Sequence, residues 1–159
     1  MAFSTPDLSD AHPEHTRAVE LQMAAFGLHR VFCGRIVTVK CFEDNSLVKE
    51  LLGQPGKGKV LVVDGGGSLR KALLGDQIAA GAVANGWSGV VINGCIRDVE
   101  EIDRMEIGVK ALGAIPVKTE KRGEGQADIP VSFGNVTFQP GHYLYADRNG
   151  ILVADKALP

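Results

Sequence analysis

An arginine and an aspartate stand next to each other at positions 97 and 98, where the apolar run VVINGCI gives way to a helix-like pattern. A guanidinium offers a planar fork of N–H donors that can grip a carboxylate or an enolate oxygen. A carboxylate supplies the hard anionic oxygen that Mg²⁺ and Mn²⁺ prefer. Arg97 and Asp98 therefore predict a site that binds a small anion beside a divalent metal ion, Mg²⁺ or Mn²⁺.

The same residues also fit a purely structural interpretation. In the run DVEE, residues 98–101, Asp98 could accept from the helix backbone while Glu101 reaches back to the start of the helix, which is a capping box. Arg97 would then belong to a surface ion pair of little energetic value. The local sequence favours neither interpretation.

A second stretch of the same kind supports the chemical interpretation. The residues LGDQ, 74–77, also lie where a glycine turn opens a helical pattern, and 20 residues separate Asp76 from Arg97. One strand-helix-strand step brings two parallel strand ends to the same edge of a sheet, where ligands of such folds collect. The start of a helix there presents backbone N–H groups to a carboxylate. The residues predicted to bind substrate in this way are Gly75, Asp76, Gln77, Ile78 and Arg97.

The elements that must position these residues follow from the hydrophobic pattern. Strands are expected within residues 31–42, 59–67, 88–96 and 109–119, and helices within 45–58, 73–87 and 98–106, after a first helix near Asp7 and Asp10. Alternating strands and helices indicate parallel βαβ units. Residues 131–158 instead have turn pairs between short apolar stretches, which predict antiparallel hairpins. The expected fold is a single α/β domain over residues 1–159, with a layered mixed sheet.

Bulk properties exclude several classes of protein. A formal net charge of −2 and a pI near 6.1 give no general attraction to nucleic acid or to anionic membranes. Neither a secretory signal nor an apolar stretch long enough to cross a bilayer is apparent, so we expect a soluble, cytoplasmic protein. Cys33, Cys41 and Cys95 are odd in number and widely spaced, which argues against a disulfide framework and a zinc site.

Other polar motifs are weaker. The cluster GGG at 65–67 lacks the Gly-Lys-Ser/Thr of a P-loop and the third small residue of a dinucleotide fingerprint, so a tight turn is the better interpretation. His12 and His15 could share a helix face, but no third ligand lies nearby in the sequence, and His29 and His142 stand alone. A histidine metal site is therefore not predicted.

The sequence resembles the RraA-like family, which includes the regulator of ribonuclease E activity A and metal-dependent 4-hydroxy-4-methyl-2-oxoglutarate aldolases. The resemblance is carried by TPDLSDA, GRIVTVKCFEDN, GKVLVVDGGGSLRKALLGD, GVVINGCIRDVEEI and FGNVTFQPGHYLYADRNGILVA. It implies a swivelling β/β/α fold and a homotrimer, or a dimer of trimers, with sites near subunit boundaries. Aldolase members have an aspartate, twenty residues, Arg-Asp and a further acidic residue, and Asp76, Arg97, Asp98 and Glu101 match that pattern.

The resemblance implies a function and roles for these residues. The substrate would be a 2-oxo acid that is cleaved to release pyruvate, and oxaloacetate decarboxylation would pass through the same enolate. Asp98 would hold the metal, and Arg97 and Asp76 would be catalytic. Glu101 would not bind the metal itself but would help to position the residues that do.

The family also implies a rival function, a non-catalytic inhibitor of ribonuclease E. Such an inhibitor would dock on arginine-rich segments through acidic side chains. The residues considered for that surface are Glu43, Asp44, Glu100, Glu101 and Asp103.

Overall fold

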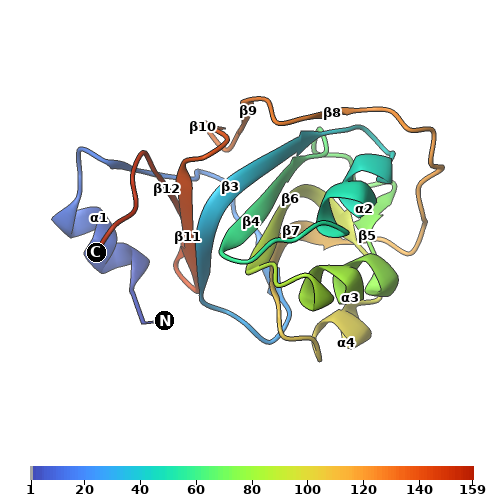
Figure 1. Ribbon diagram of the computed structural model, residues 1–159, viewed down its shortest axis with the longest axis horizontal. Helices are drawn as coiled ribbons and strands as arrows, with labels where there is room; N and C mark the ends of the chain where they lie inside the picture. The colour runs from blue at the N-terminus through green and yellow to red at the C-terminus, as the bar shows by residue number, and fades with distance from the viewer. Residues whose placement is uncertain (1) are drawn as a thin grey trace.

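The computed structural model describes residues 2–159 and contains one large mixed sheet with helices packed against it (Figure 1). The strand order is β1-β12-β11-β3-β4-β6-β7-β2, with β5 added to β6 and β8 added to β3. The strands are β1 (Thr16–Ala18), β2 (Ala24–Phe26), β3 (Phe32–Lys40), β4 (Lys59–Asp64), β5 (Ala72–Leu74), β6 (Gly89–Ile96), β7 (Gly108–Ala114), β8 (Gln126–Ala127), β9 (Val131–Phe133), β10 (Val136–Phe138), β11 (Tyr143–Asp147) and β12 (Gly150–Ala154). The helices are α1 (Thr5–Ala11), α2 (Ser46–Leu52), α3 (Asp76–Ala84) and α4 (Val99–Ile102).

The central strands are apolar on both faces because both faces are covered. In β4, Val60 and Val62 join an inner cluster with residues of β11 and β12, whereas Leu61 and Val63 pack under helices α2 and α3. Neighbouring strands β3, β4, β6 and β7 run parallel. Parallel strands buried on both faces have nearly continuous apolar sequences. This pattern is why the central strands could be predicted from the sequence.

The sheet is strongly rolled. Strands β1 and β2 lie at opposite ends of the strand order, yet only residues 19–23 connect them. Eight flat strands would extend over about 34 Å, whereas this connection reaches about 20 Å at most. The Lys110 ammonium group on β7 also donates to the Asp147 carbonyl oxygen on β11 at 2.7 Å, although three strands separate the two in the order. The two ends of the sheet must therefore approach each other.

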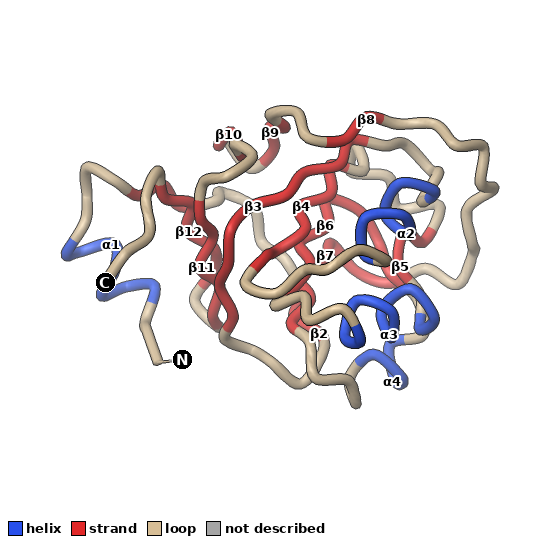
Figure 2. Tube along the Cα trace, viewed as in Figure 1, coloured by secondary structure: helices blue, strands red, loops and turns tan. Residues whose placement is uncertain are grey.

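Helices α2, α3 and α4 gather on one side of the sheet, and α1 lies apart from them near the C-terminus (Figure 2). Helix α1 was expected near Asp7 and Asp10, and it ends at Ala11. In the described part of the chain, no helix has the length and hydropathy of a membrane-crossing segment. Helices α2, α3 and α4 cover one side of the sheet, and the first residues of α3 lie at its edge.

Most expected elements are present, with informative differences. Residues 73 and 74 were expected to begin a helix, but together with Ala72 they form the short strand β5, because pairing with β6 outweighs their helical preference. Strand β7 ends at Ala114 rather than continuing to residue 119, and α4 spans only four residues. The two C-terminal hairpins, β9–β10 and β11–β12, are antiparallel as predicted.

Glycine turns appear at the predicted places. Gly134 and Asn135 have φ of 60° and 62°, the left-handed geometry of a two-residue hairpin turn. Gly66 and Gly67 also have positive φ, and the Asn93 carbonyl oxygen accepts from the N–H groups of Gly65 and Gly67. The 65–67 cluster is thus a tight turn between β4 and β5.

Candidate functional site

The ends of strands β5 and β6 bring the two predicted stretches together. Leu74 pairs directly with Ile96 in parallel register, and the Arg97 N–H donates to the Leu74 carbonyl oxygen at 2.9 Å. The chain therefore leaves both strands at the same edge of the sheet, so that Gly75, the residue after β5, lies beside Arg97, the residue after β6. The expected proximity of residues 75–78 to residues 97 and 98 is confirmed.

Asp98 does not form the capping box that its local sequence allowed. It precedes α4 in the left-handed region, with φ 57° and ψ 44°, and its side chain caps nothing in that helix. Instead, Asp98 Oδ2 accepts a hydrogen bond from the Asp76 backbone N–H at 2.9 Å, at the start of α3. One substrate-binding expectation is thereby corrected, because the Asp76 amide donates to a carboxylate of the chain itself. A non-glycine residue in this conformation is strained, and such residues gather at functional sites.

A pocket of about 370 Å³ opens at these strand ends, and we call it the strand-end pocket. All of the predicted substrate and metal residues line it, namely Gly75, Asp76, Gln77, Ile78, Arg97 and Asp98. Its volume lies in the range typical of small-molecule sites.

Gly75 is required by close packing at this edge. A methyl group added at Gly75 would lie 2.9 Å from Asp98 Oδ2 and 3.6 Å from Arg97 Nε. Its φ of −128° is ordinary extended backbone, so the constraint is steric rather than conformational. A side chain at this position would therefore displace the Asp98 carboxylate, and glycine avoids that contact.

A second wall of the strand-end pocket was not predicted. It comes from the start of α2 and from residues 116–124, which we call the 116–124 loop, and it includes Asn45, Lys49, Lys118, Thr119 and Lys121. These residues are distant in sequence from the strand ends, and tertiary contacts bring them there. The available signal was the run PVKTEKRGEG, a long polar stretch without periodicity, since such long loops are often functional.

Side-chain hydrogen bonds fix the 116–124 loop beside the pocket. Buried Asn45 donates to the Leu73 carbonyl oxygen at 3.2 Å and accepts from the Thr119 hydroxyl at 2.7 Å. The loop is also tied by the Ala72 N–H, which donates to the Val117 carbonyl oxygen at 2.7 Å. The Asn45 side chain makes no hydrogen bond that caps α2 and instead joins three segments around the pocket.

The Asp44 carboxylate anchors the far end of the 116–124 loop. It accepts from the backbone N–H groups of Arg122 and Glu124, at 2.8 and 3.1 Å, and from both the N–H and hydroxyl groups of Ser46. Burial alone would raise the pKa of Asp44, but these hydrogen bonds outweigh it and lower the pKa from 3.8 to about 2. Asp44 is therefore ionised and holds the loop at all ordinary pH values.

The donor set of the pocket suits a hard cation held mainly by water. Asp76 and Asp98 both line the pocket, and one Asp98 oxygen is used by the Asp76 N–H. Among residues 2–159, no group of three or more His, Cys, Asp or Glu side chains converges as a metal cage. Zinc sites need such a cage, whereas Mg²⁺ binds through one or two carboxylates and keeps several waters.

Two predicted groups of residues are not brought together in the structure. Glu101 is exposed on α4 and is not part of the pocket lining, so the structure does not bring it to the metal residues. The proposed acidic docking surface is also incomplete. Asp44 is fully buried, and Glu43 accepts from the Ser68 hydroxyl at 2.6 Å and pairs with Arg70 at 2.8 Å.

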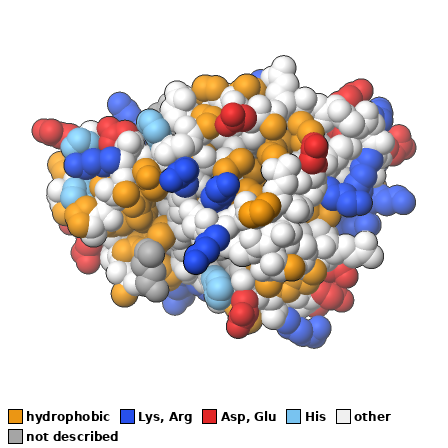
Figure 3. Space-filling view, viewed as in Figure 1, with side chains coloured by type: hydrophobic (Ala, Val, Ile, Leu, Met, Phe, Trp, Pro, Cys, Tyr) orange, Lys and Arg blue, Asp and Glu red, His pale blue; other side chains and the backbone are white. Residues whose placement is uncertain are grey.

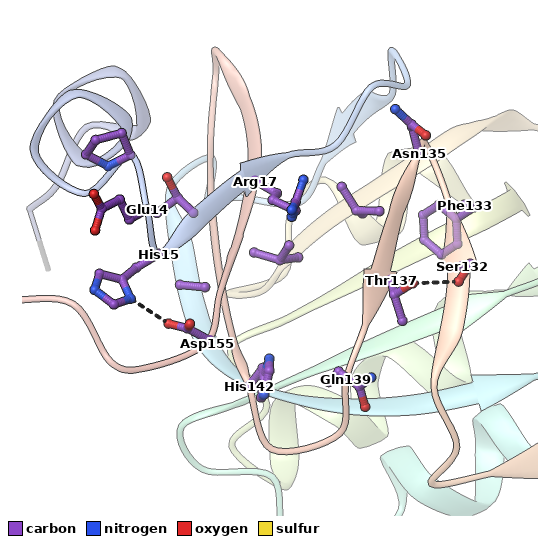
Figure 4. Close-up of a pocket in the computed structure, with 15 residues that line it drawn as sticks. Glu14, His15, Arg17, Ser132, Phe133, Asn135, Thr137, Gln139, His142 and Asp155 are labelled. Carbon is purple, nitrogen blue, oxygen red and sulfur yellow. Dashed lines mark hydrogen bonds and ion pairs between the residues drawn. The ribbon is translucent and has the colours of Figure 1, made fainter.

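A larger hollow of about 1010 Å³ lies on another part of the molecule, and we call it the large groove. Figure 4 shows His15 directed toward Asp155, with a distance of 3.1 Å between His15 Nδ1 and Asp155 Oδ1. His142 and Arg17 also line the groove, which lies between β1 and the β9–β10 hairpin. None of the residues predicted to bind substrate or metal lines this groove.

The buried cysteines are not nucleophiles. Burial, followed by the charges of Asp44 and Asp64, raises the pKa of Cys41 to about 12, and burial also raises the pKa of Cys95. A thiol with a raised pKa is largely protonated and unreactive near neutral pH. Covalent catalysis through these thiols is therefore not indicated.

Comparison with known proteins establishes the family. The RraA-like family, described as Aldolase/RraA, matches residues 5–153. This chain belongs to the RraA-like family. A relative in Ectopseudomonas mendocina, named "Putative 4-hydroxy-4-methyl-2-oxoglutarate aldolase", is 58% identical over 99% of this chain and 98% of its own length. A protein of the same name in Hahella chejuensis is 56% identical over 99% of this chain and 96% of its own length.

Solved structures of similar chains have the same fold but different titles. The RNA-processing inhibitor RraA from Thermus thermophilis matches with a TM-score of 0.96 and 44% identity, covering 100% of this chain and 96% of that one. A structure from Geobacillus kaustophilus, titled S-adenosylmethionine: 2-dimethylmenaquinone methyltransferase, matches with a TM-score of 0.97 and 49% identity, covering 98% and 97%. The RraA-like fold is therefore shown, and the chemistry must be argued from the site.

Proposed function

We propose that this RraA-like protein is a divalent-metal-dependent aldolase that cleaves 4-hydroxy-4-methyl-2-oxoglutarate and releases pyruvate. The observation that carries the proposal is the convergence of Asp76, Arg97 and Asp98 on one pocket at the ends of β5 and β6. A guanidinium and two carboxylates suit a small anion and a cation. They suit the adenosine part and sulfonium charge of a methyl donor less well.

The metal would be held by Asp98, and Asp76, which lines the same pocket, would bind waters of the metal. When bound, Mg²⁺ or Mn²⁺ would act as a Lewis acid that polarises the 2-oxo group of the substrate. The small protein donor set agrees with an ion that retains most of its waters. Such an ion would be bound weakly and removed easily by a chelator.

Arg97 would grip the carboxylate next to the 2-oxo group and stabilise the negative charge that grows during cleavage. Its guanidinium donates to the Pro116 carbonyl oxygen at 3.4 Å, which leaves other N–H groups for the substrate. The N–H groups of Gln77 and Ile78, in the first turn of α3, would bind a second oxygen.

The reaction breaks the bond between C3 and C4 of the substrate. The hydroxyl group at C4 loses its proton, the bonding electrons pass to C3 to form the enolate of pyruvate, and C4 becomes the carbonyl carbon of a second pyruvate. Asp76 would hydrogen-bond that hydroxyl group and receive its proton, directly or through water. Protonation of the enolate at C3 then completes the first pyruvate.

Oxaloacetate decarboxylation would use the same groups. Loss of CO₂ from oxaloacetate leaves the same pyruvate enolate, so Arg97 would stabilise the same developing charge. The site therefore supports both activities without any additional residue.

The test is a pyruvate-release assay coupled to NADH oxidation by lactate dehydrogenase. Purified protein should release pyruvate from both substrates with Mg²⁺ or Mn²⁺, lose this activity with EDTA, and regain it when the metal is restored. The coupling enzyme is assayed with added pyruvate under each condition. Activity that persists after exhaustive chelation would contradict the metal-dependent mechanism.

A regulatory function is the second candidate, because the similar RNA-processing inhibitor RraA matches over its whole fold. Inhibition of purified ribonuclease E by this chain, with no pyruvate release from either substrate, would favour that function over the aldolase.

A homo-oligomer is part of the same proposal. Phe42, Leu69 and Val117 are large apolar residues with 55, 60 and 45% exposure. Leu69 precedes β5 in the chain, and the Val117 carbonyl oxygen accepts from the Ala72 N–H of β5. Burial of such residues in a subunit contact would be favourable. Light scattering of the purified protein should give the mass of a trimer or hexamer, and a monomer of 16.9 kDa would contradict this.

A further inference from the structure

The wall that sequence analysis missed has its own chemistry. We propose that Lys118 and Lys121 of the 116–124 loop bind the distal carboxylate of a dicarboxylic 2-oxo acid. The inference rests on the proposed aldolase function and adds the residues that select the substrate. Arg97 would hold the carboxylate beside the 2-oxo group, and the two lysines would hold the carboxylate at the other end.

The charge balance of the strand-end pocket supports this assignment. Its lining has four cationic side chains, Lys49, Arg97, Lys118 and Lys121, and two carboxylates, Asp76 and Asp98, a formal excess of two positive charges. Arg97 alone is enough for the carboxylate of a pyruvyl group. The remaining positive charge therefore matches a ligand with a second carboxylate.

The loop also places both lysines in the same pocket wall that begins at Arg97. At the start of the loop, the Pro116 carbonyl oxygen accepts from the Arg97 guanidinium. Two residues later, Lys118 forms an isolated parallel β-bridge with Ala72 of β5. The lysines therefore continue the pocket wall away from the Arg97 grip. A pocket of about 370 Å³ has room beyond a three-carbon pyruvyl group.

The loop is held rigidly for a surface segment. Thr119, between the two lysines, is buried and donates to Asn45, and Asp44 holds the backbone at Arg122 and Glu124. Figure 3 shows Lys and Arg side chains gathered on the right side of the view, over the region of α2 and the 116–124 loop of Figure 1. Fixing the backbone in advance lowers the entropy lost when the lysines bind a ligand.

The test compares two inert ligands that share the 2-oxo acid group. Pyruvate has one carboxylate, and 2-oxoglutarate has two but lacks the 4-hydroxyl group needed for cleavage. Binding of each to the Mg²⁺-loaded protein is measured by calorimetry for the wild type, for the double variant Lys118→Met/Lys121→Met, and for Lys156→Met near the C-terminus as a matched control. Methionine keeps most of the side-chain length and removes the charge.

The wild type and Lys156→Met should bind 2-oxoglutarate about tenfold more tightly than pyruvate, and the double variant should lose that preference while binding pyruvate normally. In turnover, the double variant should raise KM for 4-hydroxy-4-methyl-2-oxoglutarate about tenfold with kcat changed by about twofold or less. The double arginine variant, Lys118→Arg/Lys121→Arg, should retain the preference.

The outcomes separate the two proposals. A wild type that releases pyruvate but binds both ligands equally would overturn the lysine subsite and leave the aldolase proposal intact. The same holds if the folded double variant loses both ligands to the same extent. A wild type that neither releases pyruvate nor binds either ligand would overturn both proposals.

Discussion

Two hollows of this molecule, the large groove and the strand-end pocket, differ in size and in chemistry, and the strand-end pocket is the better candidate site. The large groove, about 1010 Å³, has a His15–Asp155 pair exposed to solvent. The strand-end pocket, about 370 Å³, has a strained aspartate, an arginine and a helix start at two adjoining strand ends. What distinguishes the strand-end pocket is the convergence of charged side chains and helix-start N–H groups from two adjoining strand ends.

The comparison also separates two uses of a carboxylate. Asp155 pairs with a histidine at the surface, where such a contact contributes little. Asp98 leaves its own helix uncapped and adopts left-handed geometry to reach the start of α3. The fold therefore accepts a local cost at Asp98, and the variants below test whether function explains it.

Replacing Arg97 should have the largest effect. Arg97→Ala should lower kcat for pyruvate release about 10² to 10³-fold, because the charge that grows in the transition state loses a donor. Arg17→Ala, in the large groove, removes the same charged group from the other hollow and should leave turnover unchanged. Near-normal turnover in Arg97→Ala would mean that the smaller pocket is not the active site.

Replacing Asp98 should weaken metal use. Asp98→Asn keeps a residue that tolerates left-handed geometry but removes the charge, so the Mg²⁺ concentration for half-maximal activity should rise about 10 to 100-fold. Asp155→Asn is the matched change in the large groove and should leave the Mg²⁺ titration unaltered. Identical Mg²⁺ titrations for Asp98→Asn and the wild type would show that Asp98 does not bind the metal.

A single methyl group at Gly75 should have a moderate effect. Gly75→Ala would place Cβ 2.9 Å from Asp98 Oδ2, and the resulting shift should lower kcat/KM about tenfold or more. Gly113→Ala on β7 is the control, because its added Cβ would meet nothing within 4 Å. Equal activity of the two variants would show that the Asp98 carboxylate can shift without loss of function.

The smallest effect concerns acid stability of the 116–124 loop. The pKa of Asp44 is about 2 in the fold against 3.8 ordinarily, so its stabilisation is fully present above about pH 4 and disappears as the pH falls through about 2. Asp44→Asn should therefore lower the free energy of unfolding at pH 7, with the difference from the wild type shrinking at low pH. Urea denaturation between pH 2.5 and 7 measures this, and a pH-independent difference would contradict the role of the charge.

Much of the fold could be predicted because the central strands bury both faces. The runs around Val60–Val63 and Val90–Ile92 are apolar without interruption, and the turn at Gly134–Asn135 has a clear sequence signal. Strands β1, β2, β5 and β8 were missed because they are two or three residues long and, unlike the equally short β9 and β10, are not joined to a partner by a tight turn. Such segments become strands only through their partners in the sheet, which local sequence does not identify.

Half of the site could be predicted, for a related reason. Asp76, Arg97 and Asp98 follow strands whose parallel order the sequence indicates, so their proximity could be inferred. Lys118 and Lys121 come from an irregular loop that Asp44 and Asn45 hold in place through contacts across more than seventy residues. Local sequence could not decide whether Asp98 caps α4 or reaches α3, because the deciding partner, Asp76, lies on another helix.

The rolled sheet has a consequence for how the protein is made. Strand β1 near the start of the chain pairs with β12 at its end, Thr16 opposite Ala154. During synthesis, β1 has no partner strand until β12, the last strand of the described residues, has left the ribosome. The pairing of β1 with β12 should therefore be the last part of the sheet to assemble. A chain cut short before β12 should leave the edges of β1 and β11 unpaired and aggregate.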